Sequence, residues 1–271
     1  MGKAPQQQYL QPYFDVDWAM RPLWEDGLAE IARYDAQQVI NGKPLPYELT
    51  QVTQLEEFNQ QFDVRTDSVQ RDDVFPVVRV SQFGSLPTDM PPFHFLTTLF
   101  FRRDRPTVLH KLTATLQEAA GNTSKSFNDD DLQYVETYNS YHDGQGAGRR
   151  LLRHEVLFED ALSYCLRGLK FNELPAFDAT IVGQQQTSSA APPLLYQARV
   201  TVTDQAVSDS LAASWRVTIV LDKQKQNVYW FAHDYPNLLL RQTTWNGRIR
   251  RLKSVTRAVY GLPQNGTATH K

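Results

Sequence analysis

The chain has 271 residues, of which 41% are hydrophobic and 11% aromatic, which is enough apolar material for a sizeable core and argues against wholesale disorder. Its formal net charge of −2 excludes a global electrostatic attraction to nucleic acid or anionic lipid. No stretch of about 18 apolar residues could span a membrane as a helix. The single cysteine, Cys165, excludes an intrachain disulfide and a cysteine-rich metal site, and its apolar neighbours predict a buried packing residue.

The N-terminal part of the chain predicts an arm followed by two paired strands. Residues 1–15 are rich in glutamine and proline and lack a period, which is typical of a flexible arm. The apolar residues within 17–24 predict a patch that docks on the main body. Residues 27–40 fit both a helix and a strand, but the hairpin-like partner at 46–58 favours two paired strands.

The middle of the chain continues as strands and loops. Residues 84–92 contain a glycine and three prolines and predict a loop, and the polar residues 122–131 predict a connection. Residues 74–83 are rich in β-branched residues and predict a strand, residues 93–102 and 107–119 predict a hairpin, and residues 132–142 predict a further, alternating strand.

The period then changes from two to between three and four. Leu157, Ala161 and Cys165 recur every fourth position, which predicts one long amphipathic helix near 152–168. Gly168 lies where a helix commonly ends in a left-handed residue. We expect this to be the one helix of the chain.

The C-terminal part predicts further strands. Strands are expected at 177–182 and 194–203, separated by a surface loop at 187–193. Residues 215–260 then read as four consecutive strands joined by tight turns. Within them, Asn246-Gly247 predicts a type I′ hairpin, the turn whose two central residues both take positive φ.

These elements together predict a mainly β protein. We expect one highly curved antiparallel sheet, or a half-open barrel, of about 10–12 strands wrapped around the long helix. It would form a single domain over residues 16–260, with a frayed tail at 261–271. Strands that wrap a helix also create a concave apolar interior, a natural pocket for a lipid-like ligand.

Motifs that would define an enzyme are weak. Glu118 and His142 are the residues to which a hydrolase hypothesis is restricted, and the glycine-rich turn after His142 fits a flexible loop better than a phosphate site. No metal or cofactor site is predicted. The basic strand at 248–253 divides its charges between two faces, which favours a solvent-facing or edge strand over a nucleic-acid site.

Several stretches resemble a family of uncharacterised envelope lipoproteins of the Bacteroidota, some members of which are mislabelled as septum-formation inhibitors. The stretches lie at 24–34 (WEDGLAEIARY), 111–121 (KLTATLQEAAG), 140–141 (SY) and 158–162 (FEDAL). The family's second stretch usually carries Trp-Cys after Gln-Glu, where this chain has Ala119-Ala120. The C-terminal strand–Asn-Gly–strand pattern is more loosely similar to half-open β-barrels of the lipoprotein-carrier kind.

The resemblance implies export and a lipid-modified N-terminal cysteine, which this sequence does not contain. The location would be periplasmic or at the outer membrane if the chain derives from a longer precursor, and cytoplasmic if Met1 is native. The candidate ligand-binding residues are Trp24, Gln117, Glu118 and Tyr141, which match the family by position, together with Trp230 of the C-terminal strands.

The leading hypothesis is a non-enzymatic envelope protein that binds an apolar or lipid-like ligand in its concave sheet. The alternatives are an assembly component that docks a protein partner through sheet edges and the N-terminal arm, and a weak hydrolase. Nucleic acid is not an expected partner.

Overall fold

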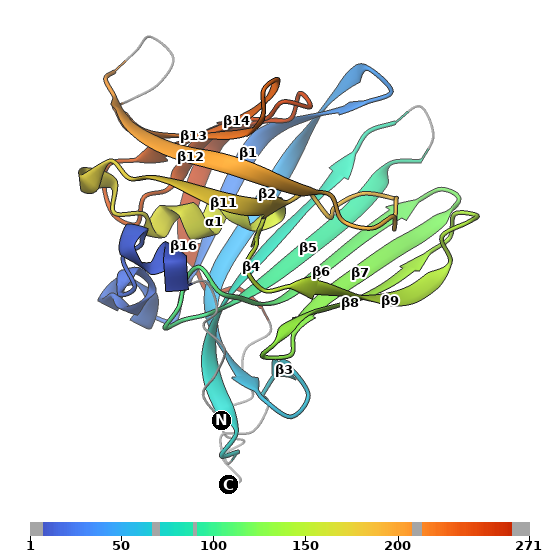
Figure 1. Ribbon diagram of the computed structural model, residues 1–271, viewed down its shortest axis with the longest axis horizontal. Coiled ribbons are helices and arrows are strands. Elements are labelled where there is room, and N and C mark those ends of the chain that lie inside the picture. The colour runs from blue at the N-terminus through green and yellow to red at the C-terminus, as the bar shows by residue number, and fades with distance from the viewer. Residues whose placement is uncertain (1–7, 67–70, 89–90, 208–212, 262–271) are drawn as a thin grey trace, which may run out of the picture.

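A computed structural model of the chain describes residues 8–66, 71–88, 91–207 and 213–261. Sixteen strands of these residues form one sheet (Figure 1). The strands are β1 (Ala29–Ile40), β2 (Lys43–Asn59), β3 (Val64–Arg65), β4 (Val74–Leu86), β5 (Phe93–Arg102), β6 (Leu109–Glu118), β7 (Gly121–Asp129), β8 (Gln133–Ser140), β9 (Ala147–Arg153), β10 (Leu157–Phe158), β11 (Ala176–Val182), β12 (Leu195–Gln205), β13 (Ser214–Asp222), β14 (Lys225–Ala232), β15 (Leu239–Thr243) and β16 (Ile249–Ala258).

The sheet is curved but not closed. Its strand order is β10-β11-β12-β13-β14-β15-β16-β1-β2-β4-β5-β6-β7-β8-β9, with β3 added beside β2, so that β10 and β9 are its two ends. All neighbours are antiparallel except β10 and β11. The first long strand pairs with the last, Ala29 opposite Ala258, which places the two halves of the chain in one continuous layer. The predicted mainly β, half-open barrel is therefore confirmed.

Local sequence explains most of the hairpins. Asn41 and Gly42 have φ values of 51° and 75° in the two-residue turn between β1 and β2, the conformation that Asn-Gly adopts readily. The predicted pairing of residues 27–40 with 46–58 and the four-stranded C-terminal segment are both confirmed. The type I′ assignment at Asn246-Gly247 is wrong, because only Gly247 has positive φ there.

The helix is much shorter than predicted. Residues 152 and 153, expected as its beginning, belong to the edge strand β9, and the helical segment consists of η4 (Glu159–Ala161), α1 (Leu162–Cys165) and η5 (Leu166–Gly168). The sequence of β9 fits either structure locally, and its pairing with β8 decides between them. The strand number of 10–12 was too low because β9, β10 and β3 were not predicted and β7 was read mainly as a connection.

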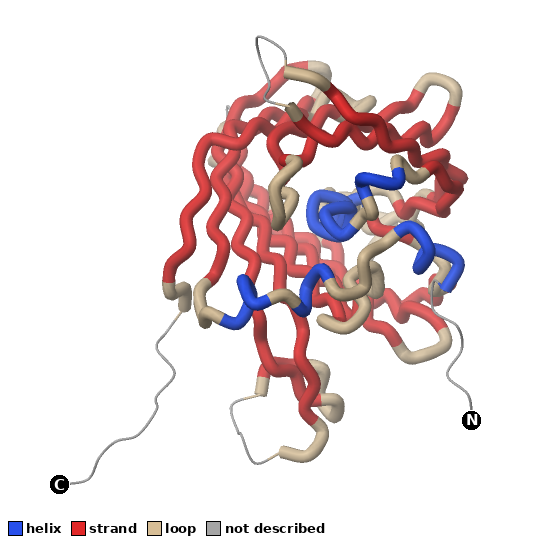
Figure 2. The backbone as a smooth tube through the Cα atoms, turned by 90° about the vertical axis from the view of Figure 1, so that its left-hand side faces the viewer, coloured by secondary structure: helices blue, strands red, loops and turns tan. Residues whose placement is uncertain are grey.

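The helical segment lies inside the barrel, surrounded by strands (Figure 2). Every residue from 156 to 169 is buried, so this segment fills the interior instead of lining one wall of a hollow. Its polar residues are held by the sheet: Ser163 Oγ donates to Gln51 Oε1 at 3.1 Å, and Gln82 Nε2 donates to Ser163 Oγ at 3.1 Å. The large apolar hollow expected from the sequence is therefore occupied by the chain's own core.

The N-terminal residues cover part of the barrel beside this segment. Three 3₁₀ helices, η1 (Gln8–Tyr13), η2 (Trp18–Met20) and η3 (Pro22–Glu25), precede β1, and a further one, η6 (Phe171–Glu173), follows the helical segment. Residues 8–15, expected to belong to a flexible arm, are packed: Leu10 and Phe14 are buried, and Asp15 N donates to Gly168 O at 2.7 Å. Residues 1–7 and 262–271 of the predicted arm and tail lie outside the described residues.

Among the described residues, no helix is long and apolar enough to cross a membrane.

Candidate functional site: a polar cavity in the barrel

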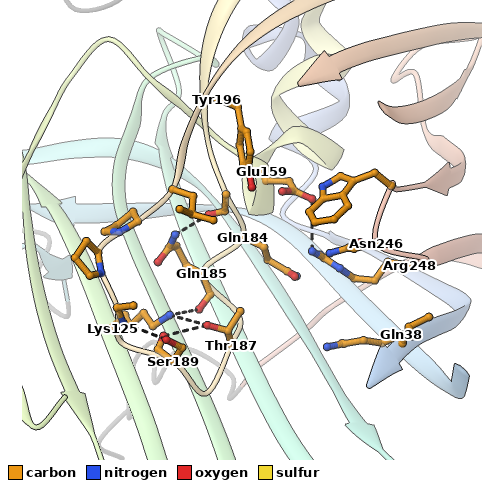
Figure 3. Close-up of a pocket in the computed structure, with 17 residues that line it drawn as sticks. Gln38, Lys125, Glu159, Gln184, Gln185, Thr187, Ser189, Tyr196, Asn246 and Arg248 are labelled. Carbon is orange, nitrogen blue, oxygen red and sulfur yellow. Dashed lines mark hydrogen bonds and ion pairs between the residues drawn. The ribbon is translucent and has the colours of Figure 1, made fainter. Parts of the chain in front are cut away.

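A cavity of about 330 Å³ lies between the helical segment and one end of the barrel (Figure 3). Its walls come from parts of the chain that are far apart in sequence. They are the end of β1, Lys125 of β7, Glu159 of η4, residues 183–194 and Tyr196 at the start of β12, and the turn from Trp245 to Arg248.

Residues 183–194 form the wall that was not expected from the sequence. Residues 187–193, predicted as a surface loop, are mostly exposed or half-exposed, but Ala190 is 0% exposed, and Gln185 and Gln186 just before the loop are buried. Lys125 Nζ donates to Gln185 O and Thr187 Oγ1, both at 3.0 Å, and an Arg150 guanidinium N–H donates to Ala190 O at 2.6 Å. The inward-pointing basic side chains of the sheet thus hold this segment through two backbone carbonyls and one hydroxyl group.

Asp160 fixes the same segment from the other side. Its buried carboxylate accepts the backbone N–H of Gln185 at 2.7 Å and that of Gln186 at 3.3 Å. Burial raises the pKa of Asp160 above its ordinary value, although these hydrogen bonds, Arg248 and Lys125 act in the opposite direction. Asp160 therefore connects the helical segment, which plugs the barrel and is called the helical plug below, to the wall of the cavity.

The charged groups at the cavity are buried. Lys125 is 5% exposed, and burial lowers the pKa of its ammonium group despite the nearby carboxylates of Asp160 and Glu136. Glu159 Oε1 lies 3.5 Å from an Arg248 guanidinium nitrogen and 3.4 Å from Asn227 Nδ2, and burial raises the pKa of this carboxyl. Two cations and one carboxylate therefore border the space.

Two aromatic rings complete the lining. Lys225 Nζ lies 4.6 Å from the ring centre of Trp245 and 5.1 Å from that of Tyr196, so a single ammonium group sits against both rings. Trp245 is 43% exposed, whereas Arg248 is 7% exposed. The cavity thus has a more exposed aromatic part and a buried charged part.

The residues predicted from the sequence lie elsewhere, and none lines this cavity. Trp24 is buried in η3, with its ring centre 5.4 Å from that of Trp18. Trp230 lies on the outer face of β14, where its Nε1 donates to Gln205. A binding role for these two tryptophans, and for the three residues described next, stays a prediction.

Three of the predicted residues do lie near one another. Gln117 and Glu118 end β6, and Tyr141 follows β8, where its backbone N–H donates to Asn122 O at 3.3 Å. Glu118 accepts an exposed hydrogen bond at 3.1 Å from His142 Nε2, if that nitrogen carries the proton. Tyr141 is 68% exposed. This is a carboxylate–imidazole contact in an exposed turn, away from the polar cavity.

The cavity residues carried only weak signals in the sequence. Lys125 lies two residues from both Thr123 and Phe127 and so shares their face of β7, which means that the strand period gives its inward direction but not the depth of the space before it. Glu159 and Asp160 stand in an otherwise apolar helical stretch, which is the kind of position where a buried carboxylate marks a polar site. Cys165 is buried as predicted, and burial raises the pKa of its thiol to about 12.

The fold and this site together define a β-barrel-like protein with a plugged interior. No protein-family model and no curated protein sequence matches the chain. Its structure is similar to the crystal structure of a β-barrel-like protein of domain of unknown function DUF1849 from Brucella abortus, with a TM-score of 0.50 and 13% identity over 84% of this chain and 97% of that chain. This similarity supports the half-open barrel, and no match supports the resemblance to Bacteroidota envelope lipoproteins.

Proposed function

We propose that the protein is a binding protein that holds a small amphiphilic ligand, with one anionic group and an apolar or ring-containing part, in the cavity at the end of its barrel. The observation that carries the proposal is the state of Arg248. Its guanidinium group is buried and borders the cavity, and the side-chain hydrogen bond it makes to the described residues is a long one, 3.5 Å to Glu159.

A guanidinium group carries five N–H donors and stabilises a buried anion by charge-assisted hydrogen bonds. Lys125 adds a second cation with three donors, of which Gln185 O and Thr187 Oγ1 take two. An anionic group of a ligand would therefore accept hydrogen bonds from donors that the protein itself leaves unused. The nearby carboxyl group of Glu159 reduces the positive charge that Arg248 and Lys125 present, which lowers the affinity for simple anions that make no further contacts.

The apolar part of the ligand would lie against Trp245, Tyr196 and the apolar residues of the 183–194 segment, among them Pro193 and Leu194. The proposal thus keeps the lipid-like ligand predicted from the sequence but gives it a charged end. The volume of about 330 Å³ lies at the lower limit of ordinary ligand sites, which favours a short chain or a single ring system.

Binding without chemistry is the simpler role for this lining. The carboxyl group of Glu159 is held by Arg248 and Asn227, and none of the residues that line the cavity is a histidine. A location in the cell envelope stays a prediction from the sequence resemblance.

The experiment compares octanoate with octanol by isothermal titration calorimetry, and uses anilinonaphthalene sulfonate as a fluorescent competitor. Octanoate is expected to bind at least about tenfold more tightly than octanol, because only octanoate pairs with Arg248. Arg248→Gln should reduce octanoate affinity by about tenfold and leave octanol unchanged. Lys223→Gln, which removes a charge from an exposed turn, is the matched control and should leave both unchanged.

Equal affinities for octanoate and octanol, or an Arg248→Gln variant that binds octanoate like the unmodified protein, would contradict the proposal. Displacement of anilinonaphthalene sulfonate by octanoate in the control variant but not in Arg248→Gln would assign the binding to this cavity.

A further inference from the structure

The outer face of the sheet carries a row of three arginines around Trp230. The strand register places Arg216 of β13 opposite Trp230 of β14, Trp230 opposite Arg241 of β15, and Arg241 opposite Arg251 of β16. Because adjacent strands are about 4.8 Å apart, the row extends about 14 Å across the strands. These strands follow one another in the sheet shown in Figure 1.

The row points away from the core. Its neighbours along the strands are buried on the opposite face, among them Val217, Tyr229 and Arg250. Arg251 is exposed, and the other three residues of the row are partly exposed. The row is therefore separate from the cavity, whose charged residues face the interior.

The positive charge of this row is only partly balanced by the protein, through Asp35 of β1, the cross-strand partner of Arg251. Within the described residues, no carboxylate forms an ion pair with Arg216, Arg241 or Arg251, whereas other outer arginines such as Arg199 are paired with a carboxylate. The acids at the end of the row, Asp35 and Glu48, contact a lysine instead: they lie 3.7 and 2.9 Å from Lys253 Nζ.

Trp230 positions the row. Its Nε1 donates to Gln205 Oε1 at 2.9 Å, which fixes the indole plane, and the guanidinium carbon of Arg241 lies 5.1 Å from the ring centre. The Nε atoms of Arg216 and Arg241 are buried, and neither has a hydrogen-bond partner in the described part of the chain.

We propose that this row is a docking surface for an acidic segment of a protein partner, one that presents several Asp or Glu carboxylates to the guanidinium groups. Guanidinium and carboxylate pair in a planar, bidentate geometry, and a row of such pairs gives both affinity and register. The surface differs from the sheet edges and the N-terminal arm that the sequence predicted as docking elements.

Charge and shape favour an acidic polypeptide over other polyanions. Arg241 occupies one side of the Trp230 ring, which reduces the aromatic surface on which nucleobases could stack. Trp230 is partly buried between arginines and is not placed to insert into a lipid layer. Carboxylates on an extended segment need neither stacking nor insertion.

The experiment measures binding of a fluorescein-labelled glutamate decapeptide to the full chain by fluorescence anisotropy, with tryptophan emission as a second signal. The triple variant Arg216→Gln, Arg241→Gln, Arg251→Gln is expected to lose at least about tenfold in affinity. The control variant Arg65→Gln, Arg149→Gln, Lys223→Gln removes the same charge from exposed positions elsewhere and should retain the affinity of the unmodified protein.

A second variant keeps the test decisive if the glutamines disturb folding. Replacing the three arginines by lysines retains the charge but removes the bidentate geometry, and should give an intermediate affinity with a weaker response of the Trp230 emission. Trp230→Phe should abolish the emission change that accompanies binding.

Equal losses of affinity in the row variant and in the control would show a general charge effect and overturn the proposal. It would likewise be overturned if the decapeptide does not bind while phosphatidylglycerol vesicles or a single-stranded oligonucleotide bind through the same three arginines. Octanoate affinity in the row variant should be unchanged, which separates this surface from the proposed cavity function.

Discussion

Arg167 and Glu30 form a bidentate ion pair inside the barrel, although 137 residues separate them in the sequence. Two guanidinium N–H groups of Arg167 donate to the two carboxylate oxygens of Glu30 at 2.7 and 2.9 Å. Arg167 also donates from Nε to Pro236 O at 2.9 Å and lies 5.0 Å from the ring centre of Trp18. The pair thus joins the helical plug to β1 and to the N-terminal segment.

Breaking this pair from one side should be strongly destabilising. Glu30→Gln leaves the buried Arg167 charge without its counter-ion, and we expect the free energy of unfolding to fall by roughly 3–5 kcal/mol. Urea unfolding followed by tryptophan emission measures this change. The double variant Glu30→Gln, Arg167→Met should be less destabilised than Glu30→Gln alone, because it removes the uncompensated charge.

The matched control for this prediction is Asp178→Asn, which breaks the exposed pair of Asp178 with Arg199. Solvent screens that pair, so we expect little change in stability. A Glu30→Gln protein as stable as Asp178→Asn would show that the buried pair does not hold the plug in place.

Gly247 lies where the β15–β16 turn closely approaches β1, and substituting it tests how much this approach matters for stability. Its φ is 80°, and a Cβ atom at this position would meet Val39 Cγ2 at 2.6 Å. We expect Gly247→Ala to lower the free energy of unfolding by roughly 1–3 kcal/mol, since backbone strain and overlap add. Gly144→Ala, with a φ of 78° but open space around it, should cost less.

The second variant Gly247→Ala, Val39→Ala separates the two causes. Removing the Val39 methyl groups should restore part of the stability lost in Gly247→Ala. If Gly144→Ala and Gly247→Ala are equally destabilised, the contact with Val39 does not contribute.

Asp160 should make stability fall as pH rises. Burial raises its folded-state pKa above 3.8, so the folded protein holds this proton more tightly than the unfolded chain does. The contribution of the protonated group is fully present below the unfolded pKa and is lost as pH rises through the folded pKa. The charged groups that act on it are Arg248, Lys125 and Glu159. Burial also raises the pKa of Glu159.

The variant Asp160→Asn resembles the protonated side chain at every pH. As pH rises from about 4 to 7, the unmodified protein should therefore lose more unfolding free energy than Asp160→Asn does. Urea unfolding at several pH values measures it. A difference that grows in favour of the unmodified protein would mean that its ionised carboxylate stabilises the fold.

Cys165 should be unreactive in the folded protein. It is buried, and burial raises the pKa of its thiol to about 12, so little thiolate is present at neutral pH. Ellman's reagent is expected to react with one thiol per chain in denaturant and with almost none under native conditions. Rapid native labelling would show that the plug leaves the barrel readily.

Side-chain alternation was sufficient to predict most of the long strands and the mainly β class, because a period of two reports directly that the two faces of a strand meet different surroundings. The hairpin between residues 27–40 and 46–58 was predicted correctly, and Asn41 and Gly42 between its strands adopt the positive φ that these residue types tolerate. The strand at 147–153 was missed because its first residues belong to a glycine-rich stretch and residues 152 and 153 were assigned to the helix; its pairing with β8 is a long-range feature that the local pattern does not report.

The content of the barrel and the position of the cavity depended on the tertiary structure. Lys125, Glu159, Trp245 and Arg248 come together only when β1 pairs with β16 and residues 183–194 turn inward. A sequence period states which way each side chain points, but it does not state which distant segment lies opposite. For that reason the mainly β fold followed from the order of residues, whereas the filled interior and its polar cavity followed from long-range packing.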